Sequence, residues 1–137
     1  MNLQLNTIRV RIFHQMSKKL TSEELNSLIS EFINKVSEKF TIEKAFLYGS
    51  YAKGTAHELS DVDLLIISPD LPVRATKGMN GYRIISQLDK VYPDIELSAI
   101  HPEGLNNEIT KAFYDEIFKT GINFTTTNSS VPQQPLL

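Results

Sequence analysis

Residues 45–67 read AFLYGSYAKGTAHELSDVDLLII, two hydrophobic runs separated by a polar stretch that opens with Gly-Ser and closes with Asp-Val-Asp. Each run has the length and the flanking turn residues of a strand. Successive side chains of a strand point to opposite faces, so Asp61 and Asp63 share one face while Val62 points into the core. This stretch therefore predicts two strands whose junction carries a pair of carboxylates.

The composition of this junction points to a metal and a phosphate. Two carboxylates about 6–7 Å apart at Cα on one face can bind a hard divalent cation, or two cations close together. The turn at Gly49 and Ser50 leaves backbone N–H groups free, and these suit the phosphate groups that such a cation accompanies. Lys53 is a further candidate for phosphate contact, although most such residues are solvated surface charges.

A third strand is predicted over residues 95–100, where polar and apolar residues alternate. Glu96 lies on its polar face. If this strand neighbours the strand of the Asp pair, Glu96 can bind a metal and accept the proton of an attacking hydroxyl. Asp94 lies on the same face two residues earlier and is the second candidate for this role.

The remaining segments predict helices packed on a sheet. Apolar periodicity and turn signals predict helices over residues 21–40, 75–92 and 105–119, a short helix within 49–55, and a last short strand over 122–124. Strands interleaved with helices in this order predict an α/β (α+β) fold, a small mixed β-sheet with helices packed on it.

Several residues mark the ends and faces of these helices. Thr21 and Glu24 have the spacing of a capping box, and Gly121 stands where a left-handed C-terminal cap belongs. The inward-facing stripe predicted for the last helix consists of Leu105, Ile109, Phe113 and Ile117.

The chain has the length of a single domain, predicted over residues 21–124. Residues 1–20 allow two interpretations, a short edge strand or an N-terminal extension that precedes an alternative start of translation at Met16. Residues 125–137 are rich in Thr, Asn, Ser, Pro and Gln and predict a disordered tail.

The composition argues against several classes of protein and site. A net charge of −2 gives no broad surface for nucleic acid. Cysteine is absent, which excludes disulfides and thiolate metal sites and fits the cytoplasm. The longest aliphatic run, residues 64–67, is too short to span a membrane. We therefore expect a cytoplasmic protein without a membrane segment.

The spacing of the central motif resembles a known signature. Gly-Ser, ten residues and Asp-Val-Asp stand together with Ala52, Gly54, Ser60 and Leu64 in their places. This pattern resembles that of the polymerase-beta-like nucleotidyltransferase superfamily, over residues 40–124. The similarity is closest to the minimal nucleotidyltransferase domains, which act as antitoxins beside HEPN toxins.

This resemblance implies a role for each site residue. Gly49 and Ser50 would hold the β- and γ-phosphates of a nucleoside triphosphate, and Asp61 and Asp63 would ligate two Mg²⁺ ions. Glu96 would stand where the family usually has an aspartate as third carboxylate. An acceptor hydroxyl would attack the α-phosphorus and pyrophosphate would leave. Short HEPN-partnered members transfer AMP from ATP to a tyrosine of the toxin, so the resemblance implies a protein adenylyltransferase with an antitoxin role.

Two alternative functions stay open at this point. The first is a catalytically idle, antitoxin-like module that neutralises a partner by binding alone, and it would tolerate loss of Asp61 and Asp63. The second is a transferase for a small-molecule or RNA hydroxyl, which would need no partner protein.

Overall fold

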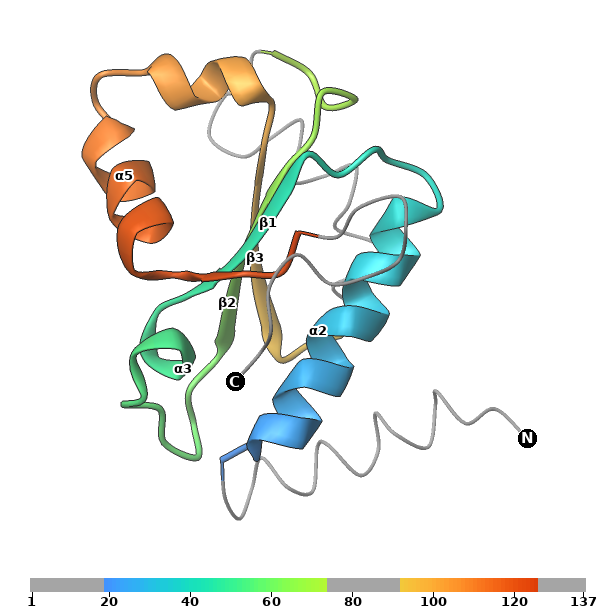
Figure 1. The fold of residues 1–137 in the computed structure, drawn as a ribbon, viewed down its shortest axis with the longest axis vertical. Helices are drawn as coiled ribbons and strands as arrows, with labels where there is room; N and C mark the ends of the chain where they lie inside the picture. The colour runs from blue at the N-terminus through green and yellow to red at the C-terminus, as the bar shows by residue number, and fades with distance from the viewer. Residues whose placement is uncertain (1–18, 74–91, 126–137) are drawn as a thin grey trace.

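A computed structural model describes residues 19–73 and 92–125 of the chain, and these contain a four-stranded sheet of order β3-β2-β1-β4 (Figure 1). The strands are β1 (Lys44–Tyr48), β2 (Val62–Ile67), β3 (Ile95–Ile100) and β4 (Ile122–Asn123). β1 pairs antiparallel with both β2 and β4, whereas β2 and β3 are parallel. This mixed sheet with helices packed on it confirms the predicted fold class.

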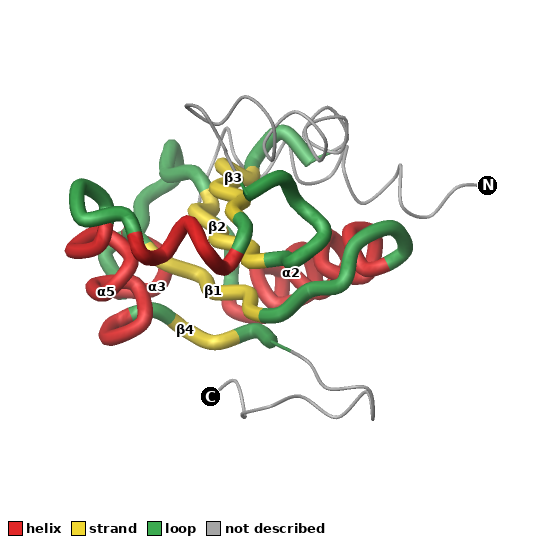
Figure 2. Tube along the Cα trace, turned by 90° about the horizontal axis from the view of Figure 1, so that it is seen from above, coloured by secondary structure: helices red, strands yellow, loops and turns green. Residues whose placement is uncertain are grey.

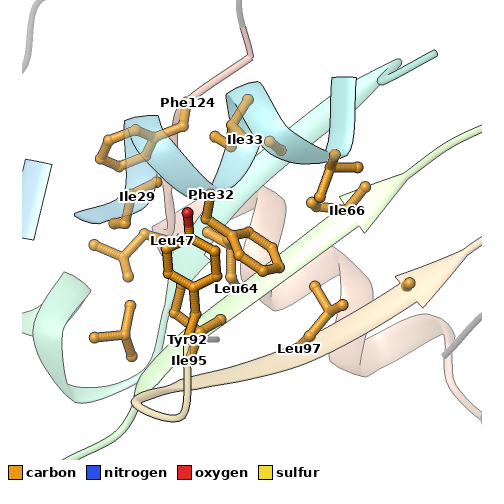
Figure 3. Close-up of a cluster of buried hydrophobic side chains, with 14 of the residues drawn as sticks. Ile29, Phe32, Ile33, Leu47, Leu64, Ile66, Tyr92, Ile95, Leu97 and Phe124 are labelled. Atoms are coloured by element: carbon orange, nitrogen blue, oxygen red, sulfur yellow. The ribbon is translucent and has the colours of Figure 1, made fainter. Parts of the chain in front are cut away.

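The first described helix, α2 (Ser22–Ser37), begins at the predicted capping box. The Thr21 hydroxyl accepts the Glu24 N–H at 3.1 Å, and the Glu24 carboxylate accepts the Thr21 N–H at 2.9 Å. The helix ends at Ser37, before the predicted limit of residue 40. Its buried stripe packs against one face of the sheet and consists of Ile29, Phe32, Ile33 and Val36. Figure 3 labels the first three of these in the core.

The sheet has two differently used faces, because side chains alternate along each strand. On one face Leu47, Leu64 and Leu97 pack with α2 in the main core. On the other face Phe46 and Leu65 pack against α5 (Lys111–Thr120) in a smaller cluster. Figure 1 shows the strands between α2 and α5, and Figure 2 shows the same arrangement from above. The side chains of Asp63 and Glu96 belong to the face that carries α5.

The prediction of one helix over residues 105–119 is wrong. A 3-10 helix, η2 (Pro102–Asn106), comes first, and α5 begins only at Lys111. Between them the Asn107 side chain accepts the Ile109 N–H at 2.8 Å, a local bond that competes with helix formation. As a result Ile109, predicted to face inward, lies outside α5 and is 90% exposed. Phe113, also predicted to face inward, lies on α5 and is 46% exposed.

The predicted left-handed cap at Gly121 is also wrong, because this residue is extended, with φ −78° and ψ 171°. Glycine is needed there for close packing instead. A Cβ would lie 2.6 Å from the carbonyl oxygen of Ile117 and 2.8 Å from that of Leu47. The missing side chain lets the chain pass from α5 directly into β4, which confirms the predicted last strand.

Three predictions lie wholly or largely outside the described residues: the segment before residue 19, the helix over 75–92 except for Tyr92, and the tail after Thr125. The domain limits therefore remain predictions. At the two ends of the described chain, Leu20 is buried in the main core and the Thr125 hydroxyl accepts the Ala45 N–H at 2.9 Å. No helix within the described residues has the length and apolar character needed to cross a membrane.

Replacing Gly121 by alanine should lower the free energy of unfolding by about 2 kcal/mol, because the new Cβ would collide with two backbone carbonyls. Gly104→Ala is the matched control, since its Cβ would meet only the Ile100 side chain, at 3.7 Å. Urea unfolding measures both variants. Equal losses in the two would contradict the packing role of Gly121.

Candidate active site

The site lies where the parallel strands β2 and β3 begin. Asp63 pairs with Glu96 in the register of the two strands, and their side chains share a hydrogen bond. The predicted neighbour relation between the two acidic strands is therefore confirmed. Two carboxylates in contact repel each other when both are ionised. This pair therefore favours either a shared proton or a bound cation between the two groups.

Asp61 stands just before β2 and is exposed to solvent. Val62, between the two aspartates, is fully buried, as the alternation predicted. The charge of Asp61 contributes to the raised pKa of Asp63, which places the two carboxylates in one electrostatic environment. The three acidic groups thus gather at one edge of the sheet.

The surroundings of Asp63 raise its pKa from 3.8 to about 6. Partial burial is the largest cause, followed by the hydrogen bond with Glu96 and the negative charges of Glu96 and Asp61. Each of these effects disfavours the ionised form. A bound cation would favour the ionised form of Asp63 instead.

The residues predicted as the third carboxylate lie in different environments. Glu96 is exposed and contacts Asp63. Asp94 precedes β3 and is only 3% exposed, and its backbone carbonyl accepts the Val62 N–H at 2.8 Å. The structure therefore brings Glu96 into contact with Asp63, whereas Asp94 is buried next to the start of β2.

Gly49 lies directly against Asp63. Its φ of +76° is a conformation that glycine adopts readily, and a Cβ at this position would overlap the Asp63 carboxylate. The short helix α3 (Ser50–Lys53) follows at once and ends at Gly54, whose φ is +78°. The Gly-Ser turn and the carboxylates are thereby adjacent, as a site for a metal and a phosphate requires.

Two further residues of α3, Tyr51 and Lys53, lie in different surroundings. The Tyr51 hydroxyl accepts the Leu20 N–H at 3.1 Å, and the ring packs on the main core, so Tyr51 anchors α3. Lys53 is exposed and is the last residue of α3, and its N–H donates to the Gly49 carbonyl at 3.0 Å.

Sequence reasoning did not assign Tyr48 and Ser98 to the site. Tyr48 stands opposite Asp63 in the β1–β2 register, and its hydroxyl is 3.1 Å from the Ser98 hydroxyl on β3. Burial is the main cause that raises the pKa of Tyr48, and the charges of Asp63 and Glu96 add to it. Alternation along the strands was the available signal, because Ser98 follows Glu96 by two residues and so shares its face.

The donor set fits a hard divalent cation. Within residues 19–73 and 92–125, no three Asp, Glu or His side chains stand close enough to hold one ion. Mg²⁺ does not require such a closed cage, because it is usually bound by one or two carboxylates together with water and substrate phosphates. Asp63 and Glu96, with Asp61 nearby, offer that type of partial coordination.

Comparisons with known proteins identify the family of this chain. The nucleotidyltransferase domain family matches residues 29–121. A candidate protein adenylyltransferase of Methanocaldococcus jannaschii is 43% identical over 84 residues, which make up 60% of this chain and 50% of that protein. A second candidate protein adenylyltransferase of the same organism is 33% identical over 101 residues, 72% of this chain and 97% of that protein.

Two further similarities extend these matches. The protein adenylyltransferase MntA of Thermococcus cleftensis is 36% identical over 53 residues, 39% of this chain and 54% of that protein. The matched part of this chain thus spans about half the length of two of the curated relatives. The crystal structure of a candidate nucleotidyltransferase from Sulfolobus solfataricus superposes with a TM-score of 0.53 and 19% identity, covering 87% of this chain and 99% of that one, and so shares its fold.

Gly49 and Gly54 form a pair that tests the close approach of the Gly49 backbone to the Asp63 carboxylate. Alanine would strain both backbones because both have positive φ, and it would strain Gly49 more, since its ψ of −155° belongs to a region that essentially only glycine adopts, whereas Gly54, with ψ 17°, is left-handed helical. Only at Gly49 would the Cβ overlap a carboxylate, since Gly54 has open space around it. We expect Gly49→Ala to weaken Mg–ATP binding at least about tenfold in calorimetric titrations. Gly54→Ala should retain binding, and equal losses would contradict this role of Gly49.

In the presence of a chelator, the stability of the wild type should fall as pH rises through about 6. The folded chain binds a proton at Asp63 more tightly than the unfolded chain does, because the pKa is raised from 3.8 to about 6. The resulting stabilisation is fully present below 3.8 and is lost above about 6. Solvent screening of this partly exposed group limits it to about 1 kcal/mol.

Thermal unfolding between about pH 4 and about pH 8 measures this dependence. Asp63→Asn should flatten the profile, whereas Glu58→Gln, which changes an exposed carboxylate of the preceding loop, should leave it as in the wild type. A wild-type profile that stays flat through this range would refute the raised pKa.

Proposed function

Because this chain belongs to the nucleotidyltransferase domain family, we propose that it transfers a nucleoside monophosphate from a nucleoside triphosphate to a hydroxyl group and releases pyrophosphate. The observation that carries this proposal is the contact of Asp63 with Glu96, with Gly49 directly against the Asp63 carboxylate. A phosphate chain at the Gly-Ser turn would meet the carboxylates without an intervening side chain.

Each residue has a role in this proposal. Gly49 and Ser50 would hold the β- and γ-phosphates, and Lys53 would add positive charge at the end of α3. Asp61, Asp63 and Glu96 would hold Mg²⁺, two ions in all; when bound, these supply the positive charge that stabilises the phosphates during transfer. That charge would also remove the mutual repulsion of the carboxylates, which favours binding at neutral pH.

The chemistry needs one proton acceptor near the reacting hydroxyl. The acceptor oxygen forms a bond to the α-phosphorus, and the bond from that phosphorus to the pyrophosphate oxygen breaks. The hydroxyl proton goes to a carboxylate of the site, and we assign this role to Glu96, which is exposed to an incoming acceptor and contacts Asp63.

The substrates we propose are ATP and a tyrosine hydroxyl of a HEPN-type toxin in the cytoplasm, which gives this chain an antitoxin role. Two considerations support the choice. Three curated proteins similar to this chain carry names of protein adenylyltransferases. The signature itself resembles that of HEPN-partnered domains. A transferase acting on a small molecule or RNA is the alternative that the same chemistry allows.

Transfer of label from α-labelled ATP into a host lysate, with Mg²⁺, tests the proposal. The wild type should label one protein band, the acceptor. Asp61→Asn with Asp63→Asn should reduce the labelling rate at least about a hundredfold, because the charge that stabilises transfer is no longer held. Asp115→Asn, which removes an exposed carboxylate on α5, is the control for loss of a single charge.

Neutralisation of the toxin provides a second readout for the same variants. If the doubly substituted chain neutralised the toxin as well as the wild type did, the chain would act by binding alone and the enzymatic account would be wrong. Labelling of RNA or of a small molecule in the absence of any partner protein would replace the protein acceptor with the alternative one.

A further inference from the structure

We propose that Tyr48, Ser98 and Phe113 bind the nucleoside of the substrate, with the Tyr48 and Ser98 hydroxyls at the ribose and the Phe113 ring stacked on the base. This inference rests on the proposed function, because it takes the α-phosphate to lie at Asp63 and Glu96.

The order of chemical groups on this face of the sheet follows the order of groups in a nucleotide. The Gly49 turn comes first, at the end of β1, and the row of Asp63 and Glu96 comes next. Ser98 lies one step further, two residues along β3 from Glu96 and therefore about 6–7 Å away. That step is comparable to the span from a 5′-phosphate to the hydroxyls of its own ribose.

The hydroxyl pair has spare hydrogen-bonding capacity. The Tyr48 and Ser98 oxygens are 3.1 Å apart, so one donates to the other. One hydroxyl hydrogen and several lone pairs remain available, since each group is both a donor and an acceptor. Both side chains are only partly buried, so a ligand on this face can reach them. Such a pair suits the hydroxyls of a sugar.

Phe113 supplies an aromatic surface beside Tyr48. Its ring lies 5.6 Å from the Tyr48 ring at 89° and 5.2 Å from the Tyr114 ring at 65°. These two neighbours hold it in place, yet 46% of the residue is exposed. A fixed, half-open ring packed on Tyr48, which stands opposite Asp63, is suited to stacking against a base, and stacking tolerates different bases because each has an aromatic face.

Binding of Mg–ATP compared with Mg–tripolyphosphate separates the nucleoside from the phosphates. In calorimetric titrations of the full chain, Phe113→Ala should weaken ATP binding about tenfold and leave tripolyphosphate binding unchanged. Phe113→Leu, which retains most of the packing against Tyr48, should weaken ATP binding as well. Ile109→Ala is the control, because it removes a 90% exposed apolar side chain just before α5 and should change neither affinity.

The hydroxyl pair is tested with nucleotides that lack a ribose hydroxyl. Ser98→Ala and Tyr48→Phe should each weaken ATP binding about threefold to tenfold and reduce the preference of the site for ATP over its 2′-deoxy and 3′-deoxy analogues. Thermal unfolding midpoints near that of the wild type would show that the variants are folded.

The outcomes separate this inference from the proposed function. Loss of tripolyphosphate affinity equal to the loss of ATP affinity, or unchanged ATP affinity in both Phe113 variants, would overturn it. Unchanged ATP affinity with slower labelling of the protein acceptor would also overturn it, and would assign Phe113 to the acceptor surface. If the wild type bound neither ligand, the proposed function would fail too.

Discussion

The parallel pairing of β2 and β3 holds two carboxylates, Asp63 and Glu96, against each other, and the site depends on this contact. The contact is unfavourable when both groups are ionised, and after burial it is the next cause that raises the pKa of Asp63. It persists because the same strands bury Leu64 and Leu97 in the core, whose hydrophobic burial fixes the register. The fold thus holds a concentration of negative charge that a divalent cation would relieve.

The two faces of the sheet have different roles, and this division lets the fold be stable while it holds the acidic groups together. One face is covered by α2 and serves only to bury apolar side chains. The opposite face is covered by α5 around Phe46 and Leu65, and beyond them it carries polar groups. Because side chains alternate, each strand contributes to both faces at once, so stability and chemistry come from neighbouring residues of the same segment. Gly49 completes the arrangement by leaving room for the Asp63 carboxylate.

Elements with a strong periodic pattern could be predicted from the sequence, and elements decided by a single local contact could not. The strand over residues 95–100 and the capping box at Thr21 were predicted because alternation and capping are local rules. The last helix was predicted too long, since an apolar residue at Ile109 fits the stripe but the Asn107 side chain bonds its N–H. Gly121 was predicted to have a left-handed conformation. It is extended instead, and glycine is needed there because two backbone carbonyls lie close to it.

The spacing of Gly-Ser and Asp-Val-Asp, the polar face of residues 95–100 and the mixed α/β class follow from local periodicity and residue type, so the sequence by itself determined which groups are available to the candidate site. Tertiary structure decided which groups meet. It paired Glu96 with Asp63, kept Asp94 buried, and brought Tyr48 to Ser98 and Phe113. These contacts join residues far apart in the chain, and their geometry is set by strand register and helix packing, which local sequence rules do not specify.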